Sequence, residues 1–165
     1  MIAPTKEPTV HLLCGYAAAG KTSLARRLSE ESGAVRFTLD EWMLSLYGWS
    51  PYDARYGPAA ERVKELIWSV AAQCLAGGLD VVLDWSQWSR ERRRQWSSRA
   101  TAAGARVVVH YLAVPLDTAL GRLAARNRER PAGSHELDLD EVRAFFEEHF
   151  EVPDPDEGLE IILEG

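Results

Sequence analysis

The segment GYAAAGKT, which runs from Gly15 to Thr22, has the residue types and spacing of a loop that binds a polyphosphate. Gly15 and Gly20 allow the backbone to turn and to approach an anion with no side chain in between. The backbone N–H groups of such a turn, with the positive end of the following helix, can surround phosphate oxygens. Lys21 is then expected to contact the outer phosphates, and Thr22 to bind magnesium.

The sequence around this loop supports the same interpretation. An apolar run precedes it, and a segment with helical spacing follows it, whereas an incidental glycine turn would need neither. Three alanines within the loop leave no acidic or bulky side chain that would exclude phosphate. The predicted nucleotide-binding residues are Gly15, Tyr16, Ala17, Ala18, Ala19, Gly20, Lys21, Thr22, Ser23 and Arg122.

Two aspartates follow apolar segments, in FTLDEW and VVLDW. A carboxylate beside a phosphate loop can hold magnesium, or can orient an acceptor hydroxyl and take its proton. We assign magnesium to Asp84, together with Thr22, because Asp84 ends the more apolar segment. We assign the acceptor hydroxyl to Asp40, although Glu41 could replace it. Each aspartate could instead be a simple helix N-cap.

Arginines gather near the end of a later predicted helix and in the loop after it. Arg122 and Arg126 are four residues apart and therefore share a helix face, with Arg128 and Arg130 close behind. Arginines placed there can stabilise the charge of a phosphoryl group in transfer, or they can simply form a solvated basic helix end. The run Arg90–Arg94 predicts a solvated outer helix face. The predicted catalytic residues are Lys21, Asp40 and Arg126.

Four of the six tryptophans follow predicted strand ends: Trp42, Trp49, Trp85 and Trp88. With Asp40 they could line an acceptor pocket by stacking on a ring or an apolar body. They could equally form a small hydrophobic cluster under a long loop. The pocket hypothesis predicts an aromatic, sugar or nucleoside-like acceptor.

Apolar segments alternate with amphipathic ones along the whole chain. The strands are expected at Val10–Cys14, Val35–Leu39, Val81–Leu83, Val107–Leu112 and Leu159–Leu163. The helices are expected at Lys21–Glu31, Asp40–Tyr47, Ala59–Ala76, Arg90–Ala103, Leu116–Arg128 and from Asp138 onward. This alternation predicts an α/β fold with a parallel sheet between two layers of helices. Ligands of such sheets bind at the carboxyl ends of the strands, where the loop and both aspartates are expected.

Length and charge limit the classes of function. The 165 residues suit a single domain, 1–165, and a net charge of −6 argues against a long nucleic acid as partner. The apolar run Val107–Val114 is too short for a membrane span, which needs roughly 20 apolar residues. The N-terminus lacks the pattern of a signal peptide, and two cysteines cannot form a disulfide framework, so we expect a cytoplasmic protein.

Taken in order, these motifs resemble the small P-loop kinases of the AAA-domain type, a group that includes chloramphenicol phosphotransferase, zeta-toxin-like kinases and the kinase domain of polynucleotide kinases. The resemblance rests on GYAAAGKT, FTLDEW, VVLDWSQWSRERRR, RLAARNRER and FEVPDPDEG. It implies a parallel five-stranded P-loop NTPase fold with a short arginine-bearing lid, ATP or GTP as donor, and Mg²⁺. It also implies that Asp40 acts on the acceptor hydroxyl and that Arg122 and Arg126 lie near the lid.

The tryptophan-rich segments after Asp40 and Asp84 are not typical of that group, so the acceptor is open. A kinase for a small molecule, such as an antibiotic, a sugar or a nucleoside-like metabolite, is the main hypothesis. The alternatives are a 5′-kinase for a nucleic acid end or a nucleotide sugar, and a nucleotide-dependent switch that only hydrolyses ATP slowly. The sequence leaves the oligomeric state open.

Overall fold

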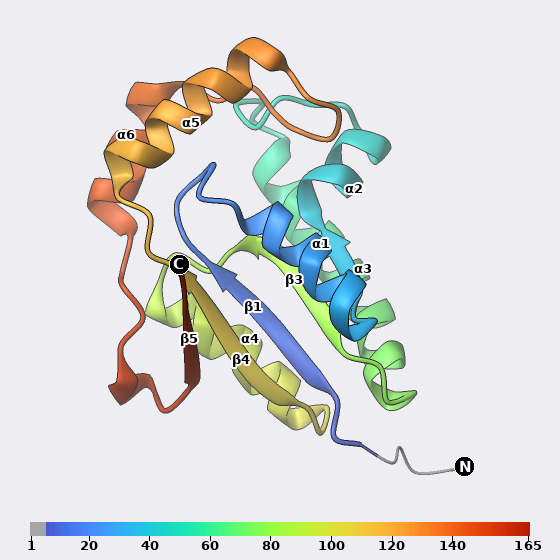
Figure 1. The fold of residues 1–165 in the computed structure, drawn as a ribbon. Helices are drawn as coiled ribbons and strands as arrows, with labels where there is room; N and C mark the ends of the chain where they lie inside the picture. The colour runs from blue at the N-terminus through green and yellow to red at the C-terminus, as the bar shows by residue number, and fades with distance from the viewer. Residues whose placement is uncertain (1–5) are drawn as a thin grey trace.

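The computed structural model describes residues 6–165. Five strands, β1 (Thr9–Cys14), β2 (Val35–Thr38), β3 (Val81–Ser86), β4 (Arg106–Leu112) and β5 (Glu160–Glu164), form one sheet in the order β2-β3-β1-β4-β5. Every neighbouring pair is parallel. The predicted α/β class with a parallel five-stranded sheet is confirmed (Figure 1).

Six α-helices surround the sheet: α1 (Lys21–Ser32), α2 (Leu39–Leu46), α3 (Tyr56–Ala76), α4 (Arg90–Ala102), α5 (Leu116–Glu129) and α6 (Leu139–His149), with a short 3₁₀ helix, η1 (Pro155–Glu157). Helix α1 covers one face, where Leu24 and Ala25 pack against Leu13 and Val82. Helices α3 and α4 cover the other face, with Ile67 and Trp96 in the larger core. Helices α5 and α6 lie together beyond the carboxyl end of β1 (Figure 1).

The strands are apolar on both faces because both faces are covered. In β1 and β3, Val10, Leu12, Val81 and Leu83 are fully buried on the α3–α4 side. A parallel strand buried in this way has no solvent-facing side, so its sequence reads as a continuous apolar run rather than as an alternation.

Three elements begin or end at residues other than those predicted from the sequence. Strand β3 continues to Ser86, so Asp84 lies within the strand and pairs in register with Thr38. Helix α2 begins at Leu39, which places Asp40 in its first turn. Helix α3 begins at Tyr56, three residues before its predicted start at Ala59. Pairing with β2 extends strand β3 beyond its apolar residues to Asp84. The pattern of apolar residues alone does not reveal this extension.

The predicted solvated face of Arg90–Arg94 is wrong for Arg93. Its side chain is fully buried and pairs with Glu157, whereas Arg94 is exposed and pairs with Glu91. Helix α4 carries several arginines that the sequence does not distinguish. The segment after α6 covers Arg93, which pairs with Glu157 there. Within the described residues, no helix combines the length and the apolar character that crossing a membrane requires.

Candidate active site

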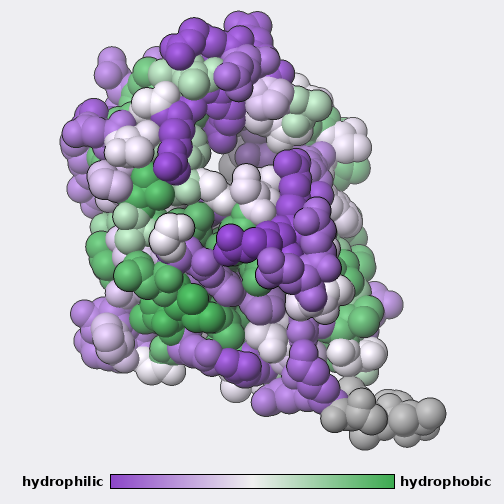
Figure 2. Space-filling model, viewed as in Figure 1, coloured by the Kyte–Doolittle hydropathy of each residue, from purple (hydrophilic) through white to green (hydrophobic). Residues whose placement is uncertain are grey.

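A cavity of about 560 Å³ opens at the carboxyl ends of β1, β2 and β3. One wall comes from the phosphate loop and α1, a second from α2, α3 and the β3–α4 connection, and a third from α5 and the loop after it. Figure 2 shows this side of the molecule, with hydrophilic residues gathered over the α5–α6 region. The lining residues predicted from sequence are Ala17, Ala18, Gly20, Lys21, Thr22, Ser23, Asp40, Asp84, Trp85, Trp88, Arg122 and Arg126.

The phosphate loop follows β1 directly and is held in a backbone conformation that few residues adopt. Gly20 has φ 107° and Ala18 has φ 60°, both in the left-handed region. Gly15 is closely packed, because a Cβ atom there would lie 3.2 Å from the Cβ of Leu112. Gly20 ends the loop and caps α1, so the first N–H groups of this helix face the cavity side of the loop.

In this structure Lys21 is bound to its own loop. Its Nζ donates to the carbonyl oxygens of Gly15 at 3.0 Å and Tyr16 at 2.6 Å. Burial lowers the pKa of Lys21 to about 8, although the charge of Asp84 opposes the shift. An ammonium group that has lost much of its hydration interacts strongly with an incoming anion. The loop therefore presents a cation that is already oriented by two carbonyl groups.

Asp84 lies at the centre of the cavity floor. Its Oδ2 accepts hydrogen bonds from the hydroxyls of Thr22 at 3.0 Å and Thr38 at 2.8 Å. Burial raises the pKa of Asp84, although both threonine hydrogen bonds and the charge of Lys21 favour the ionised form. In the described part of the chain, no group donates a hydrogen bond to Oδ1.

This donor set fits magnesium bound together with nucleotide. Magnesium prefers oxygen ligands, and it is commonly held by one or two carboxylates plus phosphates and water. One buried carboxylate beside one threonine hydroxyl matches that pattern, and so Thr22 and Asp84 are the residues that would hold the ion. Among residues 6–165, no three His, Cys, Asp or Glu side chains gather into a metal site made by protein alone.

Asp40 projects from the first turn of α2 and is about half exposed. Its Oδ1 lies 3.9 Å from Nε2 of His135, and the Tyr56 hydroxyl lies 3.4 Å from the same nitrogen. Burial lowers the pKa of His135, and the charge of Asp40 opposes this shift. The pKa of Tyr56 is raised, mainly by burial and secondly by the charge of Asp40. Asp40 is thus an accessible carboxylate that rests against two largely neutral partners.

Glu41, the alternative to Asp40, has a different environment. Its Oε1 lies 3.0 Å from NH1 of Arg36 and 3.8 Å from NH2 of Arg26. It lines the cavity, and Gly133 packs on its side chain. Glu41 is thus held in ion pairs with two arginines, whereas Asp40 has no arginine partner among the described residues.

Arg122 and Arg126 both line the cavity from α5, so the structure brings them to the phosphate loop and to Asp40. Burial lowers the pKa of Arg126, with the charge of Asp40 opposing the shift, and its Nε is buried with no hydrogen-bond partner among the described residues. A buried, unpaired guanidinium nitrogen costs free energy unless it meets an acceptor. A phosphate oxygen would satisfy it. Arg128 and Arg130 do not line the cavity.

The four tryptophans separate into two groups. Trp85 and Trp88 line the cavity, and Trp88 lies under the guanidinium of Arg92, 3.8 Å from the ring centroid. Trp42 and Trp49 do not reach the cavity. Trp42 packs near Phe37, with ring centroids 6.4 Å apart, and Trp49 stacks on Tyr47 at 4.4 Å. A position after a strand does not fix the direction of a side chain, because Trp42 on α2 and Trp49 in the segment after α2 both pack against the core.

Sequence reasoning missed three residues of this site: Thr38, Lys64 and His135. The contact of His135 with Asp40 joins positions 95 residues apart in the chain, so no local spacing could indicate it. Lys64 sits at the core-facing spacing of α3, between Val63 and Ile67. A lysine at an apolar helix position was the one available sequence signal.

The model of the AAA domain family matches residues 10–149, which include the phosphate loop, both aspartates and the α5 arginines. The chain belongs to the AAA domain family. A search of curated proteins finds no match. The family match spans most of the chain and agrees with the five-stranded sheet and the loop geometry described above.

Solved structures share the fold of this AAA domain. One chain of the Pnkp1/Rnl/Hen1 RNA repair complex is 18% identical with a TM-score of 0.71, over 86% of this chain and 43% of that chain. Chaetomium thermophilum Kti12 in complex with ADP-AlF3 is 16% identical with a TM-score of 0.70, and the match covers 94% of this chain and 88% of that chain. A sugar kinase from Janibacter sp. HTCC2649 is 17% identical with a TM-score of 0.64, over 96% and 85%. The predicted resemblance to small P-loop kinases of the AAA-domain type is confirmed.

Proposed function

We propose that this AAA domain transfers the γ-phosphoryl group of ATP, bound with Mg²⁺, to a hydroxyl of a small molecule. The observation that carries the proposal is that a half-exposed carboxylate, Asp40, shares one cavity with Lys21 and with the arginines of α5. A nucleotide-dependent switch needs the phosphate loop but no room for an acceptor. Here the cavity extends from the loop to the aromatic rings of Trp85 and Trp88.

Each group has a role that its surroundings support. Lys21 would neutralise the outer phosphates from within the loop, and Thr22 and Asp84 would hold the magnesium ion that accompanies them. Magnesium, when bound, offsets the charge that develops on the β- and γ-phosphate oxygens. Arg126 approaches from α5, where its unpaired Nε can donate to an oxygen of the group in transfer.

Asp40 supplies the proton acceptor. As the acceptor oxygen forms its bond to the γ-phosphorus, the bond from that phosphorus to the β–γ bridging oxygen breaks, and ADP leaves. The hydroxyl proton passes to the Asp40 carboxylate. Its exposure to the cavity permits this contact, and the largely neutral His135 beside it does not compensate its charge as an arginine would.

The test compares Asp40→Asn with the unchanged chain in a phosphotransfer screen of alcohols, including sugars and nucleosides. We expect ATP affinity within twofold of the unchanged chain, and transfer lower by about 10²–10⁴-fold, the usual contribution of a general base. Lys21→Ala provides the contrast, since it should weaken ATP binding itself. If Asp40→Asn transfers phosphate at the full rate, the role assigned to Asp40 is wrong.

A further inference from the structure

Lys64 is a buried lysine in the wall of the cavity, on the side that carries Asp40. Helix α3 packs against α2 and against strands β2 and β3, whereas the phosphate loop and α1 form the opposite wall. The buried positions of α3 near its middle are Ala60, Val63, Lys64 and Ile67. Lys64 is thus the only charged residue that this helix directs inward among its described residues.

The contacts of Lys64 leave its charge incompletely matched. Its side chain is only 6% exposed, and its single hydrogen bond in the described structure goes to Glu61 Oε1 at 2.8 Å. Glu61 is itself 61% exposed and also lies 3.8 Å from the guanidinium of Arg92. One solvated carboxylate, Glu61, is therefore shared by two cations, Lys64 and Arg92. An ammonium group has three N–H donors, of which Glu61 uses one.

A purely structural role does not account for this arrangement well. Burial lowers the pKa of Lys64, so the fold destabilises its charged form. An apolar side chain of similar length between Val63 and Ile67 would fill the same space without that cost. A buried lysine that lines a cavity and retains unused donors is instead a candidate for binding an anionic group of a ligand.

We infer that Lys64, assisted by Arg92, forms an anion subsite on the acceptor side of the cavity, so that the acceptor is an alcohol that also carries a carboxylate or a phosphate group. Trp88, held under Arg92, provides the adjoining apolar surface for the body of the same molecule. This inference rests on the proposed function, because it places the anion on the molecule whose hydroxyl Asp40 activates. It narrows the acceptor from any alcohol to an anionic one.

The experiment uses matched probes that differ only in the anionic group: sorbitol, gluconate and sorbitol 6-phosphate, and uridine with uridine 3′-phosphate. Binding of each to protein saturated with ADP and Mg²⁺ is followed by tryptophan fluorescence and calorimetry, and transfer from ATP is measured in parallel. We expect an anionic member of at least one set to bind at least tenfold more tightly than its neutral counterpart. The carboxylate and phosphate members show which anion the subsite prefers.

Lys64→Met removes the charge and keeps the length of the side chain, and it should abolish that preference while ATP affinity stays within twofold. Lys64→Arg should retain part of the preference. Lys6→Met, which removes a lysine with a 70% exposed side chain outside the cavity, is the matched control and should retain all of it. Thermal unfolding verifies that each variant is folded.

The two proposals fail in different ways. If no anionic probe binds more tightly than its neutral counterpart, or if Lys64→Met retains the preference, the anion subsite is wrong. If anions bind through Lys64 but the unchanged chain phosphorylates none of the probes and Asp40→Asn changes nothing, the subsite stands and the kinase role of Asp40 falls. If only neutral alcohols are phosphorylated, the kinase proposal holds and the anion subsite is overturned.

Discussion

The carboxylate of Asp84 is kept in the fold at the expense of stability. Burial raises its pKa, which means that the folded state favours the protonated form more than the unfolded chain does. Above the pKa of the unfolded chain, ionisation of this group therefore destabilises the fold. Thr22 and Thr38 reduce the cost through their hydrogen bonds but do not remove it. A bound cation would.

Asp84→Asn should therefore stabilise the free protein while it removes the metal site. The amide oxygen can still accept from both threonine hydroxyls, so we expect a gain of roughly 0.5–2 kcal/mol at pH 7. The gain should shrink as the pH falls through the raised pKa of the folded state, and it should vanish below the ordinary carboxyl pKa, where both states are protonated. Phosphotransfer should fall by about a hundredfold or more. Urea unfolding at pH 7 and pH 5 measures the first effect, and magnesium-dependent ADP affinity measures the second.

The opposite result for stability would be informative. If Asp84→Asn destabilises the free protein at pH 7, the carboxylate contributes to the fold through its hydrogen bonds more than its burial costs. Thr38→Val then separates the two terms, because it removes one of those bonds and leaves the charge. Its effect on unfolding should be destabilising in either case.

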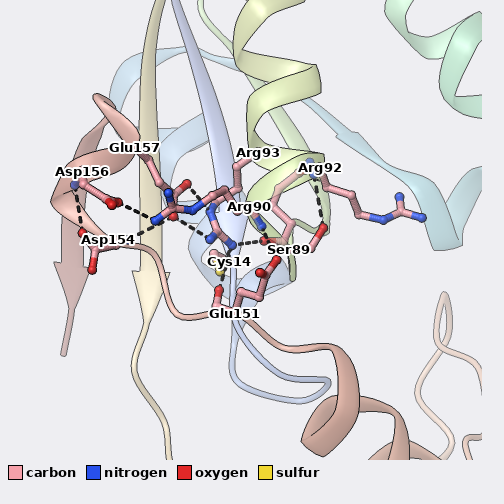
Figure 3. Close-up of polar contacts among 10 residues, drawn as sticks. Cys14, Ser89, Arg90, Arg92, Arg93, Glu151, Asp154, Asp156 and Glu157 are labelled. Carbon is pink, nitrogen blue, oxygen red and sulfur yellow. Dashed lines mark hydrogen bonds and ion pairs between the residues drawn. The ribbon is translucent and has the colours of Figure 1, made fainter.

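At the scale of elements, α4 and the chain that follows α6 are joined by a buried ion pair. Arg93 donates from Nε and NH2 to both carboxylate oxygens of Glu157, at 2.8 and 2.7 Å (Figure 3). Its NH1 also donates to the carbonyl oxygens of Gln87 and Glu151, each at 2.9 Å. Arg93 thereby fixes the β3–α4 connection, which carries Trp88 into the cavity, against the segment after α6.

Removing either partner of this pair should be costly. Arg93→Met leaves the Glu157 carboxylate buried without its partner, and we expect a loss of about 3–5 kcal/mol in the free energy of unfolding. The double variant with Glu157→Gln should lose less than the sum of the two single variants. Arg94→Met, which breaks only the exposed pair with Glu91, should cause no measurable change. Urea unfolding of the four variants measures the cycle, and additive losses would contradict the proposed coupling.

At the scale of the whole molecule, three side chains link the central strand of the sheet to its last strand. His11 Nδ1 lies 2.9 Å from His110 Nε2, and His110 Nδ1 lies 2.7 Å from Glu164 Oε1. Both histidines therefore have side-chain partners within the sheet. Burial, and then the charge of His110, lower the pKa of His11 to about 4. His11 is therefore neutral in the fold at neutral pH.

The stability of the protein should therefore fall with acidity through this group. An unfolded histidine takes up a proton near pH 6.5, but folded His11 does so only near pH 4, so stability is lost as the pH falls between these values. The loss is at most about 3 kcal/mol, less whatever solvent screening relieves. His11→Gln should flatten the dependence of urea unfolding on pH between 7 and 4.5. His149→Gln, at a half-exposed histidine on α6 that takes no part in these contacts, serves as the control for the substitution itself.

Strand β5 forms one edge of the sheet and combines exposed apolar residues with charged ones. Strand β5 pairs only with β4 and exposes Ile162 and Leu163, and apolar residues gather over this part of the surface in Figure 2. Glu160 and Glu164 bound the strand at both ends. Charged residues on an edge strand hinder pairing with the edge of another sheet.

The features that could be predicted from the sequence are those that depend on neighbouring residues. Residue spacing specifies the phosphate loop because glycine freedom, a lysine and a hydroxyl act within eight consecutive positions. Apolar runs between amphipathic helices specify a parallel sheet, since each strand buries both faces. The positions of Asp40 and Asp84 at one edge of the sheet follow from that topology.

The packing of the folded chain brings distant residues into a shared environment, and this could not be predicted from the sequence. Arg93 and Arg94 are neighbours of the same type, yet the return of the chain after α6 buries one and leaves the other in water. Trp42 and Trp88 both follow strands, yet only Trp88 reaches the cavity. Lys64 became a candidate ligand because α3 directs it into a cavity formed by other elements. Burial and charge pairing depend on contacts between segments far apart in the chain, and no local pattern encodes them.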